Sequence, residues 1–457
     1  MLFSSLFFLF FFLPVFLLLY YVVPFKYKNK VLLFFSLLFY SWGEPIYILL
    51  LLFSSMLNYY GSKIIRKISY PQKRKKYFII IIILNILLLG VFKYCNFIIN
   101  NLNLLGLDIE TLNIALPLGI SFFTFQTMSY TIDVYKDKNI VPDTFLNFLT
   151  YVSMFPQLVA GPIVRYDEVS NDLKNRTITK EDFYNGFFKF LTGLFKKVLL
   201  ANNIGYIFSL ITKDISDISL LTAWLGIISF ALQIYYDFSG YSDMAKGIGE
   251  MLGFKYPDNF NYPYIAISIT DFWRRWHMTL SSWFRDYVYI PLGGNRCNKI
   301  INMRNIIIVW LLTGIWHGAS WNYILWGLYF GIILLIEKYV LKNIISKMPK
   351  LLKHIYAIIL ILVGWTIFAF EDIETGIVYL KSMFINNTII DNKFIFFISN
   401  YLLFYIFGIT FSTPIFSKMR SNIITKVLLI IIYVFLFIVT VSSLIGDSYN
   451  PFLYFRF

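Results

Sequence analysis

The chain contains three histidines, and two of them lie in unusual surroundings. His317 stands inside a long apolar run, and His277 lies in the polar, tryptophan-rich segment 271–304. Burial lowers the pKa of a histidine, so a buried imidazole stays neutral and can accept a proton at neutral pH. Such a group suits a general base for a hydroxyl that attacks an activated acyl carbon. Both histidines are therefore candidate catalytic residues. The alternative for His317 is a packed histidine bonded to a backbone carbonyl, and the alternative for His277 is an ordinary histidine at an arginine-rich helix end.

The segment 271–304 carries six basic and two acidic side chains between apolar runs. If it is helical, His277, Ser281 and Arg285 share one face, because they are spaced by four residues. One interpretation is a cytoplasmic interfacial helix whose tryptophans lie at the lipid headgroups. The other is a positively charged, aromatic-lined mouth that binds a phosphate-bearing donor from the cytosol.

Five side chains of this segment are the candidate donor-binding residues. They combine ring faces with guanidinium groups, and they are Trp273, Trp276, Arg274, Arg275 and Arg285. Asp271 precedes Arg275 by four residues, so the two can form an ion pair on one helical turn.

The composition excludes a water-soluble globule. Only 14% of the 457 residues are charged and 58% are hydrophobic, which leaves too few charges to cover a soluble surface. We therefore predict a single membrane-embedded domain, residues 1–457. The formal net charge of +15 is attributed to cytoplasmic loops and anionic lipid rather than to nucleic acid. The two cysteines predict neither a disulfide nor a zinc framework, and no metal site is predicted.

Many apolar runs approach the length of about 20 residues that a membrane span needs. The first is interpreted as a retained span rather than a signal peptide, because it has no charged start and no cleavage site. Glycine and proline interrupt two runs, which indicates bent or re-entrant pieces. The candidate spans are 2–23, 31–60, 77–99, 112–132, 145–164, 183–212, 219–240, 306–336, 354–370, 394–412 and 425–446.

The run 305–336 is too long for a simple span. Its last 31 residues would measure about 46 Å as one helix, beyond the roughly 30 Å of the hydrocarbon layer. The run must therefore tilt strongly or break. Gly314 and Gly318 flank His317, and glycine allows a helix to open at that point. His317 is expected near the middle of the membrane, where a polar side chain is costly and usually functional.

Basic residues give the orientation of the chain. The loop 61–76 has seven lysines and arginines and no acid, so we predict that it is cytoplasmic. Alternation of the following spans places the C-terminal tail, 447–457, outside the cytoplasm. The segment 271–304 is assigned to the cytoplasmic side.

These residues carry a resemblance to a known family. The chain resembles the membrane-bound O-acyltransferase superfamily, and within it the alginate O-acetyltransferase branch, over roughly residues 30–457. The tract 272–296 is the most specific part of the resemblance. The similar stretches are 121–126, 132–135, 155–165, 236–245, 271–296 and 316–321.

The resemblance implies an all-α polytopic membrane protein, in which tilted transmembrane helices, with re-entrant and interfacial helices, form a ring around a central tunnel. It implies His317 as the catalytic histidine and His277 as its partner. The implied reaction moves an acyl group, by expectation acetyl, from a cytosolic thioester such as acetyl-CoA to a hydroxyl reached from the outer side. No bound cofactor is expected, and the implied location is the bacterial cytoplasmic membrane. We assign Gln157, Asp237 and Ser281 to the tunnel lining; for Asp237, fastening of helices is an equal alternative.

The last six residues resemble the Phe-x-Tyr-x-x-Phe tail of envelope acylation systems. This resemblance implies that the hydroxyl of Tyr454 accepts the acyl group. It also implies a separate extracytoplasmic transferase of the SGNH type as partner, with an exported polysaccharide as final acceptor. The alternative is an aromatic anchor at the membrane interface.

Two other functions stay open at this point. A relative in the same superfamily transfers D-alanine to teichoic acids from a carrier-protein thioester. The block 290–296 and the tyrosine tail favour the acetyl-transferring branch instead. A transporter or flippase also uses broken helices and polar groups at the membrane midplane, but no internal repeat is visible in the sequence.

Overall fold

The chain folds into two compact units. Unit 1 comprises Met1–Phe190 and Tyr241–Pro257, and unit 2 comprises Leu191–Gly240 and Asp258–Phe457. The prediction of one domain over 1–457 stays a prediction. The computed structural model describes residues 1–136, 144–159, 161–415, 423–446 and 453.

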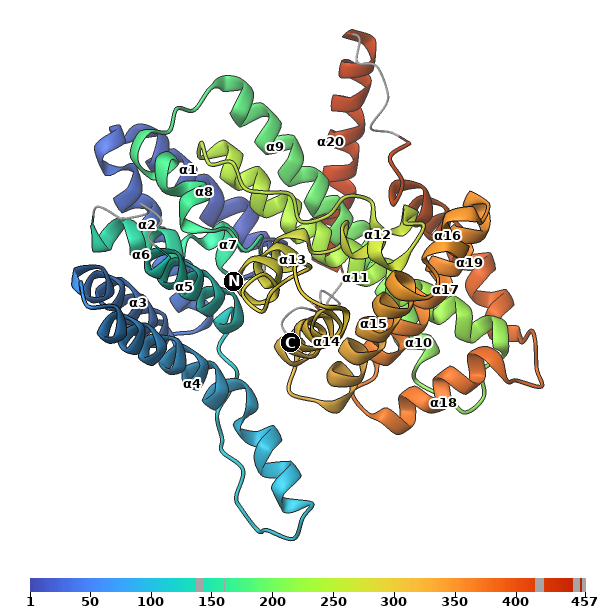
Figure 1. The fold of residues 1–457 in the computed structure, drawn as a ribbon. Coiled ribbons are helices and arrows are strands. Elements are labelled where there is room, and N and C mark those ends of the chain that lie inside the picture. The colour runs from blue at the N-terminus through green and yellow to red at the C-terminus, as the bar shows by residue number, and fades with distance from the viewer. Residues whose placement is uncertain (137–143, 160, 416–422, 447–452, 454–457) are drawn as a thin grey trace. The chain divides into compact units, whose positions relative to one another are not determined.

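Unit 1 is built from helices, and a long connection, 104–119, joins α4 to α5 (Figure 1). Its last long helix, α9, continues beyond Phe190 into unit 2. The elements are η1 Phe8–Phe12, α1 Leu13–Val22, α2 Phe25–Gly43, α3 Ile48–Lys67, α4 Pro71–Asn103, α5 Ile120–Tyr135, α6 Phe145–Ser153, α7 Phe155–Leu158, α8 Tyr166–Asn175 and α9 Lys180–Phe195.

Unit 2 is also helical, and it contains both candidate histidines. Its helix α11 returns to unit 1 after Gly240. The elements are η2 Lys196–Asn202, α10 Asn203–Ile211, α11 Leu220–Met251, η3 Pro263–Ile265, α12 Ile269–Trp273, α13 Met278–Phe284, η4 Arg285–Tyr289, α14 Lys299–His317, α15 Trp321–Tyr339, α16 Lys342–Lys347, α17 Lys350–Ala369, α18 Ile373–Phe384, α19 Asn392–Phe411 and α20 Ile423–Gly446.

Within the described residues, all regular secondary structure is helical, and eight helical segments are long and apolar enough to cross a membrane. This confirms the predicted all-α polytopic membrane protein. The segments are Ile48–Lys67, Pro71–Asn103, Lys180–Ile211, Leu220–Met251, Lys299–His317, Lys350–Ala369, Asn392–Phe411 and Val427–Gly446.

Several of the predicted spans are not single spanning helices. The run 31–60 divides into α2, which ends at Gly43, and α3, which begins at Ile48. The run 112–132 is helical only from Ile120 onward, in the 16-residue α5. Pro117 and Gly119, which disfavour a continuous helix, lie just before its first residue. The run 145–164 forms the short helices α6 and α7, with Pro156 in the first turn of α7. Proline lacks the N–H that would continue a helix through this point, so the chain begins a new helix there.

The long run 305–336 breaks, as one of its two predicted alternatives required. Helix α14 ends at His317, and α15 begins at Trp321. The two helices pack closely through glycines. A Cβ at Gly314 would come within 2.3 Å of the carbonyl oxygen of Tyr323, and one at Gly327 would come within 2.4 Å of that of Trp310. Gly314 therefore permits contact between the helices, a frequent role of small residues in membrane helices.

Candidate functional site

The predicted donor-binding residues lie at the end of α12, in the turn 274–277 that separates α12 from α13, and at the start of η4. His277 has a φ of 43°, in the left-handed region that non-glycine residues rarely adopt. The segment is therefore not one helix. His277 is buried while Ser281 is exposed, so they do not present a common face. The four-residue spacing does not place His277 and Ser281 on one face, because His277 precedes α13 and is not part of the helix.

A fixed hydrogen bond determines which nitrogen of His277 carries the proton. The Nδ1 atom lies 2.9 Å from Oδ1 of Asn259. The same Asn259 atom accepts from the backbone N–H of Thr279, at 3.4 Å, and from its hydroxyl, at 2.9 Å. An atom that accepts from a backbone N–H is an oxygen, so Nδ1 of His277 must donate to it. The neutral ring then carries its basic lone pair on Nε2.

Burial keeps this imidazole neutral. The residue is only 2% exposed. Burial lowers the pKa of His277 well below its usual range, and the nearby His317 lowers it further when charged. Phe238, from α11, packs edge-to-face against the ring with the centroids 4.7 Å apart. His277 is therefore neutral at neutral pH, and its Nε2 lone pair can accept a hydrogen bond from a hydroxyl.

His317 is the last residue of α14, beside the break in the helix. Its side chain is buried among aromatic rings. The ring centroids of Trp326 and Phe368 lie 5.0 and 5.3 Å from that of His317, both in edge-to-face geometry. Trp316 packs against the rings of both histidines, at 5.1 Å from His317 and 6.0 Å from His277. The structure therefore brings the two candidate catalytic histidines together around one indole.

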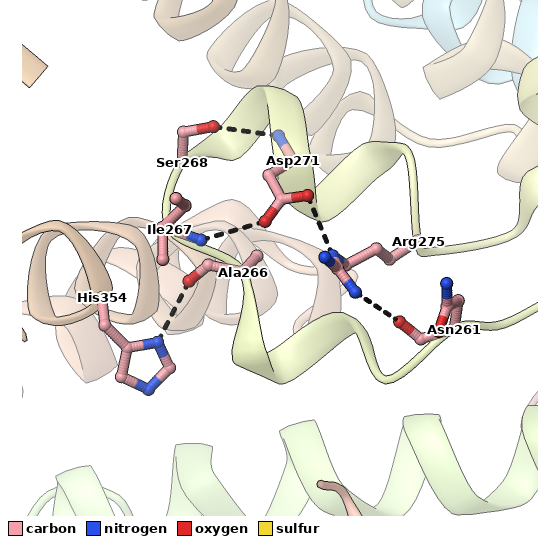
Figure 2. Close-up of polar contacts among 7 residues, drawn as sticks. All are labelled: Asn261, Ala266, Ile267, Ser268, Asp271, Arg275 and His354. Carbon is pink, nitrogen blue, oxygen red and sulfur yellow. Dashed lines mark hydrogen bonds and ion pairs between the residues drawn. The ribbon is translucent and has the colours of Figure 1, made fainter. Parts of the chain in front are cut away.

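The predicted pair of Asp271 and Arg275 is confirmed, with Oδ1 and Nε 2.9 Å apart (Figure 2). Arg275 also donates from Nη1 to the carbonyl oxygen of Asn261 at 3.2 Å. Figure 2 also shows His354, whose Nδ1 lies 3.0 Å from the carbonyl oxygen of Ala266. Since a carbonyl only accepts, Nδ1 of His354 donates. These contacts fix the chain around the start of α12.

The other two arginines of the donor-binding prediction are exposed. Arg274 is exposed beside the paired Arg275. The side chain of Arg285 is 61% exposed, and its guanidinium makes two hydrogen bonds to the carboxylate of Asp286, at 2.7 and 3.1 Å. The arrangement leaves Arg274 and Arg285 at the surface, where an anionic ligand can reach them.

The two tryptophans of the prediction belong to an aromatic cluster. Trp276 is buried and packs at 4.8 Å from Trp365. Trp273 is half-buried, with the centroids of Trp310 and Phe330 at 4.8 and 4.9 Å. These rings support the segment from within, so donor contact by either tryptophan stays a prediction.

Asp237 and Gln157 occupy different units. Asp237 is buried in unit 2, where it forms an ion pair with Lys197. Gln157 is buried in unit 1, where its amide donates to the carbonyl oxygen of Tyr151. Tyr454 lies outside the described residues. The tunnel-lining role assigned to Asp237, Gln157 and Ser281 stays a prediction. Among the described residues, no group of three or more metal-binding side chains is present.

Glu337 is a site residue that the sequence reasoning missed. Its carboxylate is buried at the start of α12, where it accepts the backbone N–H groups of Ile269 and Thr270 at 2.7 and 2.9 Å. The hydroxyl of Thr270 also donates to it, at 2.7 Å. A glutamate near the end of an apolar run, directly before the lysine-rich stretch 338–353, was the available indication. Glu337 thus fixes the helix that leads to His277.

We expect Glu337→Gln to lower the free energy of unfolding by about 2 kcal/mol. The carboxylate offers two charged oxygens to three donors, whereas the amide of glutamine offers them only one neutral oxygen. Thermal unfolding in detergent micelles would measure the loss. Glu374→Gln is the matched control, since Glu374 is exposed in the first turn of α18. Equal unfolding midpoints for the two variants would contradict the role of Glu337.

Comparisons with known proteins give a consistent picture. The sequence model of the MBOAT, or membrane-bound O-acyltransferase, family matches residues 76–373. The probable alginate O-acetylase AlgI of Azotobacter vinelandii is 40% identical over 84% of this chain and 78% of that protein. The peptidoglycan O-acetyltransferase of Helicobacter pylori is 37% identical over 84% of this chain and 80% of its own. The teichoic acid D-alanyltransferase of Bacillus subtilis is 31% identical, but over only 49% of this chain and 59% of that protein.

Proposed function

The chain belongs to the membrane-bound O-acyltransferase family and is an O-acyltransferase, and from this premise we propose that it supplies acetyl groups for O-acetylation of a cell-envelope or exported polysaccharide. The donor is a cytosolic thioester, acetyl-CoA or a similar molecule. The membrane is the bacterial cytoplasmic membrane. Support comes from the relatives, whose names specify acetylation of alginate and of peptidoglycan.

The observation that carries the chemistry is the pair of buried histidines around Trp316. A neutral imidazole can take the proton of an attacking hydroxyl, and its conjugate acid can then protonate the leaving group. His277 has its lone pair on Nε2, as its bond to Asn259 requires. We assign His317 as the base and His277 as the residue that orients the attacking hydroxyl.

The proposed step balances without a cofactor. His317 removes the proton of the acceptor hydroxyl while the hydroxyl oxygen attacks the thioester carbonyl carbon. The carbon–sulfur bond breaks, and the thiolate takes the proton back from His317, which leaves free thiol and an oxygen ester. Tyr454 is the proposed first acceptor. A second attack, by the polysaccharide hydroxyl on the tyrosyl ester, restores the phenol, and an extracytoplasmic SGNH-type transferase catalyses it.

The donor is held by the positive charge of the segment 271–304. Arg274 and Arg285 are exposed there, and a guanidinium binds phosphate oxygens through paired hydrogen bonds. To bind phosphate, the guanidinium of Arg285 must exchange its hydrogen bonds with the Asp286 carboxylate for bonds to the phosphate. The two arginines therefore suit a phosphate-bearing thioester.

Purified protein in proteoliposomes provides the test. Labelled acetyl-CoA is added to the side that carries the loop 61–76, and labelled D-alanyl carrier-protein thioester is added in a parallel reaction. We expect acetyl ester on the protein and no alanyl ester. Ester formation from the D-alanyl donor alone would instead assign the chain to teichoic acid alanylation, and the absence of ester from both donors would reject the proposal.

A further inference from the structure

A buried ion pair in unit 2 binds the C-terminal segment. Nζ of Lys197 lies 2.6 Å from Oδ1 of Asp237, and both side chains are 3% exposed. The other oxygen of the carboxylate, Oδ2, accepts the backbone N–H of Leu453 at 2.8 Å. Leu453 is separated from Asp237 by 216 residues along the chain. One carboxylate therefore connects η2, α11 and the end of the chain.

Burial of the Asp237 carboxylate requires that both of its oxygens have partners. A buried carboxylate is costly unless it is paired and its oxygens accept hydrogen bonds. Lys197 satisfies Oδ1, and the N–H of Leu453 satisfies Oδ2. The side chain of Leu453 is 8% exposed and belongs to the apolar core of unit 2. Leu453 is thus held by a charge-assisted hydrogen bond and by apolar burial together.

Asp237 is adjacent in α11 to a residue that packs against His277. Asp237 is followed in α11 by Phe238, whose ring packs 4.7 Å from that of His277. Consecutive Cα atoms are about 3.8 Å apart, so holding Leu453 restricts the reach of the next residue to a small volume. That next residue is Tyr454, the proposed acceptor.

We propose that Asp237, held by Lys197, is a positioning residue that anchors the C-terminal tail at Leu453 so that Tyr454 can receive the acyl group. The anchor deepens the proposed function and rests on it for the role of Tyr454. It contributes by restricting the motion of the attacking group, since a displacement of about 1 Å can cost about a hundredfold in rate. The same carboxylate of Asp237 would then both fasten helices, through Lys197, and position the tail, through Leu453.

Leu453→Pro tests the anchor, because proline has no N–H to donate to Asp237. Leu453→Val is the matched control, since it keeps the N–H and an apolar side chain. We expect acyl transfer by Leu453→Pro to be about a hundredfold slower than by Leu453→Val, with unchanged binding of acetyl-CoA. Equal transfer rates in the two variants would overturn the proposal.

Hydrogen exchange at the amide of Leu453 tests the contact independently of transfer. Mass spectrometry of C-terminal peptides from the wild-type protein should show slow exchange at this amide. A double variant, Asp237→Leu with Lys197→Met, removes the acceptor without leaving a buried unpaired charge. Exchange should become at least tenfold faster in it, and an unchanged rate would overturn the anchor.

The two measurements separate the anchor from the acyl relay. If Tyr454→Phe transfers acyl groups normally while the amide of Leu453 remains protected, the relay fails, the tail contact stands as a structural contact only, and the positioning role is rejected. If Tyr454→Phe is inactive and the amide is unprotected in the wild-type protein, the relay stands and the anchor is rejected.

Discussion

Replacement of His317 by alanine is expected to abolish acylation while the protein still folds and inserts into the membrane. General acid–base catalysis by one side chain contributes about a hundred- to ten-thousandfold to a rate, and His317 has this role in the proposed step. The loss should appear in kcat rather than in the binding of the donor, because the exposed Arg274 and Arg285 are unchanged. Single-turnover transfer from labelled acetyl-CoA measures it.

His354→Ala provides the control for the loss of an imidazole. His354 lies in α17, where Nδ1 bonds to the carbonyl oxygen of Ala266, and it is not one of the two rings around Trp316. Transfer by this variant should remain within a few-fold of the wild type. A His317→Ala variant that transfers as fast as His354→Ala would remove His317 from the mechanism.

The second large effect is expected from Tyr454→Phe, which deletes only the hydroxyl proposed to accept the acyl group. Transfer to polysaccharide should fall to background in this variant, because the proposed relay passes through that oxygen. The phenyl ring is retained, so an aromatic anchor at the membrane interface would be preserved. Measurement of polymer acetylation in cells that carry the variant distinguishes the two roles, and full acetylation would leave the tail as an anchor.

The sequence offered a break beside His317 as one of two alternatives, because the run 305–336 is too long for a simple span and glycines flank His317. It did not predict the turn at His277. No glycine or proline lies between Asp271 and Asp286, so local propensity favours a continuous helix. Bonds to distant residues change the outcome: Asn259 binds the imidazole, and the N–H of Asn261 donates to the carbonyl oxygen of Arg275. A strained backbone held by its surroundings is typical of a functional site.

The partners of Asp237 and Glu337 were also beyond local reasoning. Each acid could be identified as costly within an apolar setting, but not what satisfies it. The N–H groups that Glu337 binds lie 67 and 68 residues away along the chain. Only the folded chain brings such groups together, so the sequence analysis identified Asp237 without its contacts and missed Glu337.

The most direct test follows the acetyl group itself. A pulse of labelled acetyl-CoA is given to membranes that contain the wild-type protein or His317→Ala, and the C-terminal peptide is then analysed by tandem mass spectrometry. We predict labelled acetyl ester on Tyr454 in the wild type, formed before the polysaccharide is labelled, and none in His317→Ala. Equal labelling of Tyr454 in both proteins would contradict transfer at the buried histidine pair.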